Sequence, residues 1–362
     1  MTLRMDDPTQ WKPPADAAEL GQHVHGGREV RQLDLSNRDF RGAKLGGGVF
    51  HEVDFRGSRL DAADLREAAL IECKFDEASL AGANLHQAVV TGCSLSGASL
   101  RGATLTGTKF NESSATGLDL GDADLRVAVF TKVKLDRAIL TGATLVRTAF
   151  LQCDMTGADL RGGRLDSVTI LETDLRTVQL AGAAFEKCVL LKSNLAGMRL
   201  AGMGFTFTQF IDANLEGVDL AGADLRNANF KGARLAKAKL GGARASNVLF
   251  VEADMPHVDL RGADLTQSIF MDAQLERAHC VGATMYQCML QRARCQGAVF
   301  RDADLTYADF SKADISGADF TGAQMFRANL HGVQDANARI PARAVALGTD
   351  PELAAAQNFR PK

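Results

Sequence analysis

The segment ANLEGVDLAGADLRNANFKG, residues 213–232, repeats a pattern of five residues: a small residue, Asp or Asn, Leu or Phe, and two variable positions. The same register holds from Leu35 to Leu330, where every residue whose number is divisible by five is apolar, which makes 60 units in phase. Ala occupies the position two residues earlier in 33 of these 60 units. Alternate side chains of an extended segment share one face. Both positions are therefore predicted to point into a common core.

A second period, four times as long, is superimposed on the first. Phe fills 16 of the 60 central positions, and nine of the 16 fall in one class of 15 positions spaced four units apart, where an even spread (16/4) would place four. Gly follows the same spacing at 12 of 15 positions in the series from Gly42 to Gly322. The sequence thus predicts a coil of four units, one on each of four sides. The nine phenylalanines are Phe50, Phe110, Phe130, Phe150, Phe210, Phe230, Phe250, Phe270 and Phe310.

Three units show a family resemblance most clearly: Ala63-Asp64-Leu65-Arg66, Ala223-Asp224-Leu225-Arg226 and Ala263-Asp264-Leu265-Thr266. They resemble the A-(D/N)-L-x-x motif of the pentapeptide-repeat family, and the resemblance covers residues 33–332. It implies an all-β fold, a right-handed quadrilateral β-helix (a solenoid) of about 15 coils of four pentapeptides. Backbone groups would pair between coils stacked about 4.8 Å apart, which leaves open edges at the two ends.

The two flanks are predicted to cap the repeat region, because repeat rods need capped ends. Residues 1–32 form a polar N-terminal segment with Trp11 and a weakly helical stretch from Ala15 to Val24. Residues 333–362 form a C-terminal tail, in which Asp350-Pro351-Glu352-Leu353 is typical of a helix start with Pro in its first turn. Disorder of either terminus is the alternative.

Composition narrows the classes of function. The 41 Lys and Arg against 44 Asp and Glu give a net charge of -3, which argues against a nucleic-acid binder with a basic surface and against a strongly acidic mimic of DNA. No apolar run is long enough to span a membrane, and the N-terminus lacks the apolar region of a secretory signal. We expect a cytoplasmic bacterial protein that binds neither nucleic acid nor membranes, with other export routes left open.

No motif in the sequence predicts catalysis, a cofactor or a bound metal. There is no Gly-Lys-Ser/Thr phosphate loop, and the run from Gly46 to Gly48 is interpreted as a flexible corner. His23 and His25 are interpreted as solvated residues of the N-terminal flank. We therefore predict that the chain is not an enzyme.

The seven cysteines and the repeated Asp-Leu-Arg units are predicted to be structural. All seven cysteines take inward positions, where buried Cys behaves as a small apolar residue and stays reduced in the cytoplasm. In an Asp-Leu-Arg unit both charges point outward and can pair, at little gain in stability. The cysteines are Cys73, Cys93, Cys153, Cys188, Cys280, Cys288 and Cys295, and the pairs are Asp64/Arg66, Asp124/Arg126, Asp159/Arg161, Asp174/Arg176, Asp224/Arg226 and Asp259/Arg261.

One side of the predicted coil differs from the other three. On the Phe-rich side, 14 of the 30 positions next to the central ones hold Val, Leu, Ile or Met, against 4 of 90 on the other sides. We call this set of residues the apolar stripe. Either β-propensity or a binding surface would explain it. The stripe consists of Val49 and of the remaining members, which are predicted to bind a partner: Ile71, Val89, Val129, Leu151, Leu171, Val189, Leu191, Ile211, Leu249, Val251, Ile269, Met271 and Met289.

A charged ridge borders the apolar stripe at the following corner of the coil, as a polar rim or a solvated edge. Its acidic members are Glu52, Glu72, Glu112, Glu172, Asp212, Glu252 and Asp272, and its basic members are Lys132, Lys192, Arg292 and Lys312.

Three functions compete. The favoured one is a non-enzymatic interaction or scaffold protein that binds a protein partner or a second copy through the apolar stripe. Resemblance to the quinolone-resistance pentapeptide proteins implies the second, a DNA-mimic modulator of a type II topoisomerase (gyrase). The third, also from resemblance, is an accessory or effector-associated protein of a bacterial type VI secretion system.

Overall fold

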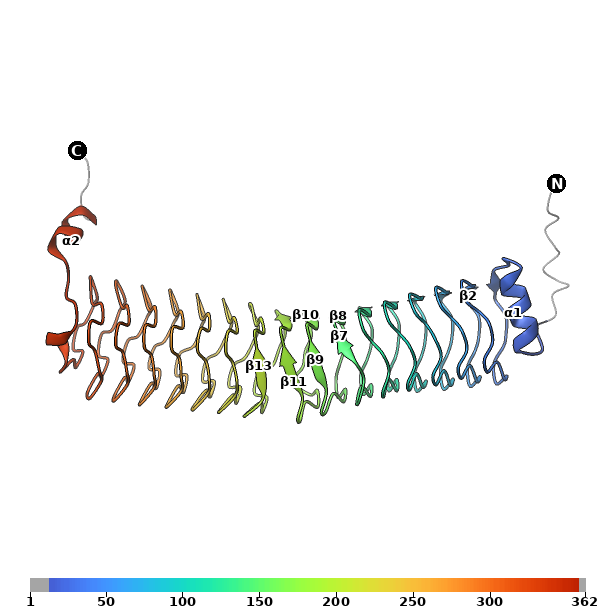
Figure 1. The fold of residues 1–362 in the computed structure, drawn as a ribbon, viewed down its shortest axis with the longest axis horizontal. Helices are drawn as coiled ribbons and strands as arrows, with labels where there is room; N and C mark the ends of the chain where they lie inside the picture. The colour runs from blue at the N-terminus through green and yellow to red at the C-terminus, as the bar shows by residue number, and fades with distance from the viewer. Residues whose placement is uncertain (1–12, 358–362) are drawn as a thin grey trace. The chain divides into compact units, whose positions relative to one another are not determined.

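The structure is a computed structural model that describes residues 13–357, so Trp11 lies outside the described residues. The chain divides into two compact units: unit 1 comprises residues 1–163 and 177–179, and unit 2 comprises residues 164–176 and 180–362. Both are mostly β, and each is a parallel β-solenoid (Figure 1). The elements are α1 (Ala17–His25), β1 (Val30–Arg31), β2 (Val49–His51), β3 (Ala69–Ile71), β4 (Val89–Thr91), β5 (Lys109–Asn111), β6 (Val129–Thr131), β7 (Leu145–Val146), β8 (Ala149–Leu151), β9 (Arg164–Asp166), β10 (Thr169–Leu171), β11 (Ala184–Glu186), β12 (Val189–Leu191), β13 (Gly204–Thr206), η2 (Arg343–Val345) and α2 (Pro351–Gln357).

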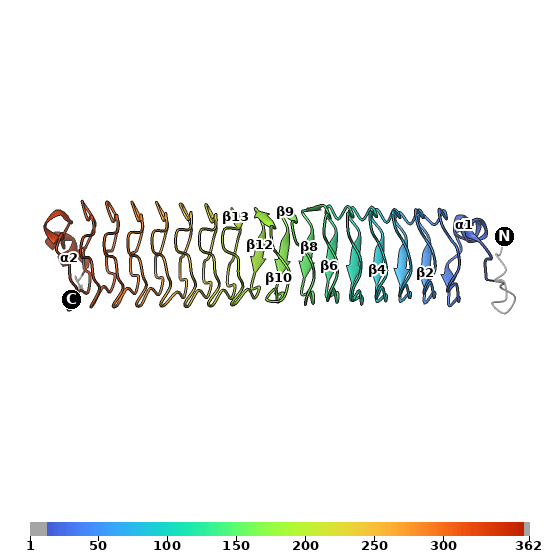
Figure 2. The ribbon, with the colours of Figure 1, turned by 90° about the horizontal axis from the view of Figure 1, so that it is seen from below.

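In unit 1, strands β1 to β6 and β8 pair in chain order, and every pair is parallel. Paired residues differ by 20 in their numbers, as in Phe110↔Phe130 and Phe130↔Phe150. Figure 2 shows β2, β4, β6 and β8 following one another along this unit. Single bridges on the other sides keep the same step, as in Lys44↔Asp64. The longer of the two predicted periods is confirmed in this unit.

Unit 2 keeps the same step in residue number with fewer regular strands. β10 pairs with β12, and β9, β11 and β13 form a second parallel set on the preceding side of the coil. After β13, the described coils pair through single bridges such as Leu249↔Ile269 and Asp254↔Gln274. Regular strand structure therefore does not extend over the whole repeat region.

The corners of the coils turn through residues in the left-handed region of backbone conformation. Gly142 has a φ of 74°, and Gly322 has a φ of 76°. Residues other than Gly occupy the equivalent place in many coils, among them Val127 with a φ of 59°. This conformation costs an L-amino acid about 1–2 kcal/mol and is rare for β-branched residues. Because Gly and other residues share this φ at the corners, the stacking of the coils, and not the residue type, sets the left-handed conformation.

The core of each unit is filled by the central apolar residues, which are almost completely buried. Phenylalanines one coil apart stack ring on ring. In unit 2 the ring centroids of Phe210 and Phe230 lie 4.7 Å apart, those of Phe230 and Phe250 5.2 Å, and those of Phe250 and Phe270 4.8 Å. These separations are within the favourable range for aromatic pairs. All seven cysteines are buried, as predicted.

Helix α1 packs on the first residues of unit 1. Asp16 caps it by accepting hydrogen bonds from the backbone N–H groups of Ala18 and Glu19, and Leu20 is fully buried. Gly48 lies directly beneath the helix, where an added Cβ would come within 2.7 Å of the Phe50 ring and 3.0 Å of Val24. The run of three glycines therefore has a packing role besides the corner at Gly47, which the sequence alone did not indicate.

At the other end, residues 343–350 lie along the last coil of unit 2. The backbone N–H groups of Arg327 and Leu330 donate to the carbonyl oxygens of Val345 and Leu347, at 2.9 and 2.8 Å. Helix α2 follows and begins at Pro351, where the sequence predicted a helix start. The backbone segment from Val345 to Leu347 thus covers part of an otherwise open edge.

Candidate functional site

The structure places every residue of the apolar stripe on the surface, beside a fully or nearly fully buried central residue. In unit 1, Val49 is 39% exposed and Val89 is 36% exposed; in unit 2, Leu249 and Met289 are each 36% exposed. The other members are half-buried. The stripe therefore presents apolar surface to solvent in each unit.

Regular strand structure and apolar side chains coincide over only part of this side. Strand β5 is fully formed, yet its outward residues are Lys109 and Asn111. In unit 2 the reverse holds, because Leu249, Ile269 and Met289 pair only through single bridges. β-Propensity explains apolar residues where strands form. It does not explain them at residues 249–289.

The charged ridge takes left-handed corner positions that turn its side chains outward from the coil. Between residues 252 and 312 it runs in a fixed order, Glu252, Asp272, Arg292, Lys312, at φ of 57° to 60°. Arg292 Nη2 lies 2.6 Å from Asp272 Oδ2, and this guanidinium lowers the pKa of the Asp272 carboxyl. The acidic half of this part of the ridge thus precedes the basic half along the chain.

Over residues 246–307 of unit 2, the opposite border of the stripe is an uncharged corner with exposed aromatic rings, and in the next coil Arg327 follows Phe326, with its guanidinium carbon 5.9 Å from the centre of that ring. Tyr307 and Phe326 are 41% and 53% exposed, and the Tyr307 ring lies edge-on to Tyr286 and to Phe326, with centroids 5.9 and 5.8 Å apart. The sequence had not predicted a role for this corner. The available signal was a series of corner residues without a charge: Ser246, Asn247, Thr266, Gln267, Tyr286, Gln287, Thr306 and Tyr307.

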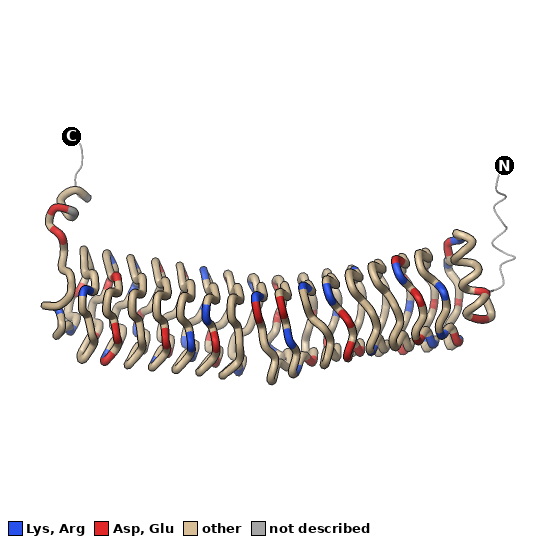
Figure 3. Tube along the Cα trace, in the orientation of Figure 1, with Lys and Arg blue, Asp and Glu red and all other residues tan. Residues whose placement is uncertain are grey.

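The six predicted Asp–Arg pairs all form. Their Oδ2–Nη2 separations are 2.5 to 2.7 Å. In each pair, hydrogen bonding to the Arg side chain lowers the pKa of the Asp carboxyl. Figure 3 shows acidic and basic segments next to one another within each unit. The acidic groups of these repeats are therefore locally neutralised.

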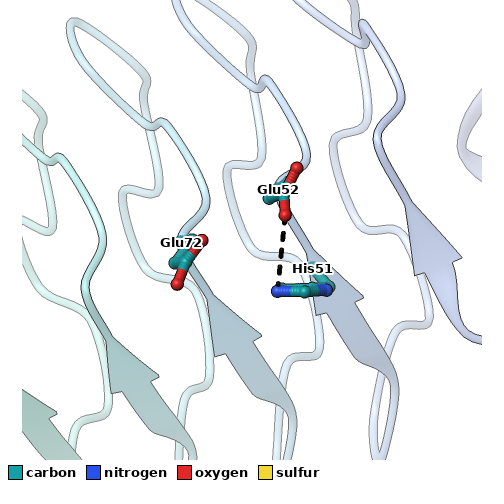
Figure 4. A group of neighbouring side chains, drawn as sticks. All are labelled: His51, Glu52 and Glu72. Atoms are coloured by element: carbon teal, nitrogen blue, oxygen red, sulfur yellow. Dashed lines mark ion pairs between the residues drawn. The ribbon is translucent and has the colours of Figure 1, made fainter.

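One cluster has the composition of a metal site: His51, Glu52 and Glu72 in unit 1 (Figure 4). His51 Nε2 lies 3.7 Å from Glu52 Oε1. Arg31 Nη2 lies 2.6 Å from His51 Nδ1, and an arginine can only donate, so Nδ1 accepts and Nε2 carries the proton of the neutral ring. A protonated Nε2 is not a metal ligand, and the guanidinium repels a cation. The cluster is better explained as an exposed hydrogen-bond network.

Three of the buried cysteines are unsuited to nucleophilic chemistry. Burial raises the pKa of the Cys153 and Cys188 thiols to about 11 and that of Cys288 to about 12. Because the thiolate is the reactive form, these groups are almost entirely protonated at neutral pH.

Two family profiles match the chain. The Pentapeptide repeats profile matches in eight copies, over residues 108–145, 123–162, 205–240, 228–267, 268–306 and 293–332. The Pentapeptide repeat region profile matches residues 48–120. No curated protein matches the chain. Among residues 13–357, no helix has the length and apolar character needed to cross a membrane.

Several solved structures are similar to the chain. A trypsin-treated form of QnrB1, a plasmid-mediated fluoroquinolone resistance protein, is 21% identical over 49% of this chain and 90% of its own, with a TM-score of 0.37. HetL from Nostoc sp. strain PCC 7120, which is involved in heterocyst differentiation regulation, is 22% identical over 87% of this chain and 94% of its own, with a TM-score of 0.20. A pentapeptide repeat protein of the Arabidopsis thaliana thylakoid lumen is 28% identical over 35% of this chain and 67% of its own, with a TM-score of 0.19.

Proposed function

The chain belongs to the pentapeptide-repeat family, and on that premise we propose that it is a non-enzymatic interaction protein that binds a protein partner through the apolar stripe. The proposal includes a right-handed coil of four pentapeptides, about 15 coils over residues 33–332, flanked by capping segments at 1–32 and 333–362. It places the chain in the bacterial cytoplasm.

One observation carries the proposal. Leu249, Ile269 and Met289 stay apolar and partly exposed where the coil forms only single bridges, while β5 forms a strand with polar outward residues. An account based on strand propensity therefore fails in both directions. Apolar surface that the fold does not require is a usual mark of a binding site.

The arrangement also has the layout of an interface. An apolar centre lies between a charged ridge on one border and, over residues 246–307, an uncharged corner with exposed aromatic rings on the other. Protein interfaces commonly combine an apolar centre with a polar rim and are enriched in Tyr, Phe, Met and Arg. Because the stripe residues are already half-buried, the affinity would come from many small contributions.

Capture from the source cell with immobilised protein tests the proposal. Leu171→Asp/Leu191→Asp places two charges on the stripe of unit 2 and should abolish capture of the specific partner. A matched control, Ala196→Asp/Ala236→Asp, places the same charges at half-buried outward positions of another side. Far-UV circular dichroism must show both variants folded. Equal capture by the wild type and the stripe variant would refute the proposal.

The structure favours neither alternative function. Similarity to a fluoroquinolone resistance protein keeps gyrase as a target to assay, but the paired Asp–Arg units neutralise the acidic surface that a DNA mimic needs. An inhibition assay of gyrase supercoiling at micromolar protein decides this directly. No described feature specifies a secretion system.

A further inference from the structure

We propose that the occupant of the apolar stripe in unit 2 is a second copy of this chain, lying antiparallel across residues 232–332 with its charged ridge reversed against that of the first copy. This inference rests on the proposed function and specifies the partner.

The order of the charges is self-complementary. Glu252, Asp272, Arg292 and Lys312 lie one coil apart, about 4.8 Å at the usual strand spacing. Consider a two-fold axis that lies in the plane of the stripe and runs across the direction in which the coils stack. It places the ridges of the two copies on the same border and reverses the order of the charges in one of them. Glu252 of one copy then faces Lys312 of the other, and Asp272 faces Arg292. A parallel pair would instead set the ridge against the uncharged corner and gain no ion pairs.

The other border is compatible with the same axis, because the uncharged corner then faces itself. Its amide side chains both donate and accept hydrogen bonds, as Gln267 Nε2 already does to Gln287 Oε1 at 2.9 Å. The aromatic rings of Tyr286 and Tyr307 add contact area without a charge. Ile269 and Met289 lie close to the axis, where apolar residues of the two copies meet. Such an isologous interface closes as a dimer.

The contact area sets the expected strength. Residues 232–332 span about five coils, roughly 24 Å, and a coil side with its two corners is roughly 20 Å wide, so about 500 Å² is covered on each copy. The total of about 1,000 Å² is at the lower end of specific interfaces. We therefore expect a dissociation constant in the micromolar range, governed by the charges at the rim.

Charge reversal tests the arrangement, with sedimentation velocity from 1 to 200 µM as the measurement. The acid-reversed chain, Glu252→Lys/Asp272→Lys, has a wholly basic ridge over these coils, and the base-reversed chain, Arg292→Glu/Lys312→Glu, a wholly acidic one. Each alone should dimerise at least tenfold more weakly than the wild type. An equimolar mixture of the two should regain the dimer, because each basic ridge then meets an acidic one.

A matched control separates the ridge from net charge. Glu216→Lys/Glu276→Lys changes the net charge as the acid-reversed chain does, on another corner where the two acids pair with Arg234 and Arg294. It should dimerise as the wild type does. Ile269→Asp/Met289→Asp should remove the dimer altogether.

The outcomes separate this inference from the proposed function. A wild type that is monomeric at 200 µM overturns the second copy as occupant, while the capture experiment with Leu171→Asp/Leu191→Asp still decides whether the stripe binds another protein. A mixture that stays monomeric overturns the antiparallel ridge. A dimer that survives Ile269→Asp/Met289→Asp overturns the stripe as the surface of self-association.

Discussion

Replacing Phe230 with Leu is expected to destabilise its coil more than replacing Phe270 with Leu. Both side chains are fully buried, so the loss of ring volume is common to the two variants. Phe230 stacks on two rings, at 4.7 and 5.2 Å. Phe270 stacks on Phe250 at 4.8 Å, and the next residue of the column is Leu290. The variants therefore differ by one ring contact, worth about 0.5–1.5 kcal/mol.

Hydrogen exchange measured by mass spectrometry is the suitable assay. Each turn of a solenoid contacts only its neighbours, so opening is local and a single global transition is not assured. Exchange of the peptides around each site, compared with the same peptides of the wild type, gives the local loss of stability. A difference of about 1 kcal/mol corresponds to a roughly fivefold ratio of exchange rates.

Phe250 provides the control, because it also stacks on two rings, at 5.2 and 4.8 Å. Phe250→Leu should match Phe230→Leu. Equal losses at Phe230 and Phe270, or a larger loss at Phe270, would show that ring stacking does not hold these coils together.

Three further predictions concern backbone, charge and thiols. Val127→Gly should stabilise its coil in unit 1 by about 1 kcal/mol, since it relieves a left-handed β-branched residue. Hydrogen exchange of the peptides around residue 127 measures this, and Val127→Ala, which keeps a Cβ, should gain less. Hydrogen bonding to Arg41 lowers the pKa of Asp39 from 3.8 to about 2, and hydrogen bonding to Thr321 and Arg301 does the same for Asp319. Their contribution to stability is thus fully present above pH 4 and lost as the pH falls towards 2; thermal melts that stay flat over that interval would contradict it. Cys153 and Cys188 should react with a thiol reagent at pH 8 only after unfolding, and fast labelling of the folded chain would disprove their burial.

The burial of the central residues could be predicted from the sequence because an apolar residue recurs at every fifth position. In a coil of this kind, a large apolar side chain at every fifth residue can leave water only by pointing into the core, and these side chains are buried in the structure. The Asp–Arg pairs followed for a similar reason. Two residues apart on an extended segment, Asp64 and Arg66 share one face and meet at 2.7 Å.

What the sequence did not indicate depends on neighbours distant along the chain. In the sequence Gly48 is indistinguishable from a corner glycine, and its packing role follows only from the position of Val24 of α1 against it. The strands of the second parallel set, β9, β11 and β13, replace single bridges on one side for a few coils, without a pattern that distinguishes those pentapeptides. The corner with Tyr286 and Tyr307 becomes visible as one surface only when residues of successive coils are stacked, because its members have no common residue type. Each of these features is determined by contacts with other coils or with α1, and not by the pattern within a single pentapeptide.

The constant step from coil to coil within each unit also governs how such a chain can change length. Removing four consecutive pentapeptides deletes one coil and returns every later side chain to its own side. Removing one pentapeptide keeps the core residues inward but carries the rest of the apolar stripe round a corner to a neighbouring side. Removing a single residue turns the core outward. Duplication or loss of a whole coil is therefore the insertion or deletion that leaves the apolar stripe intact, and the length of the stripe can be set by copy number without altering the contacts inside a coil.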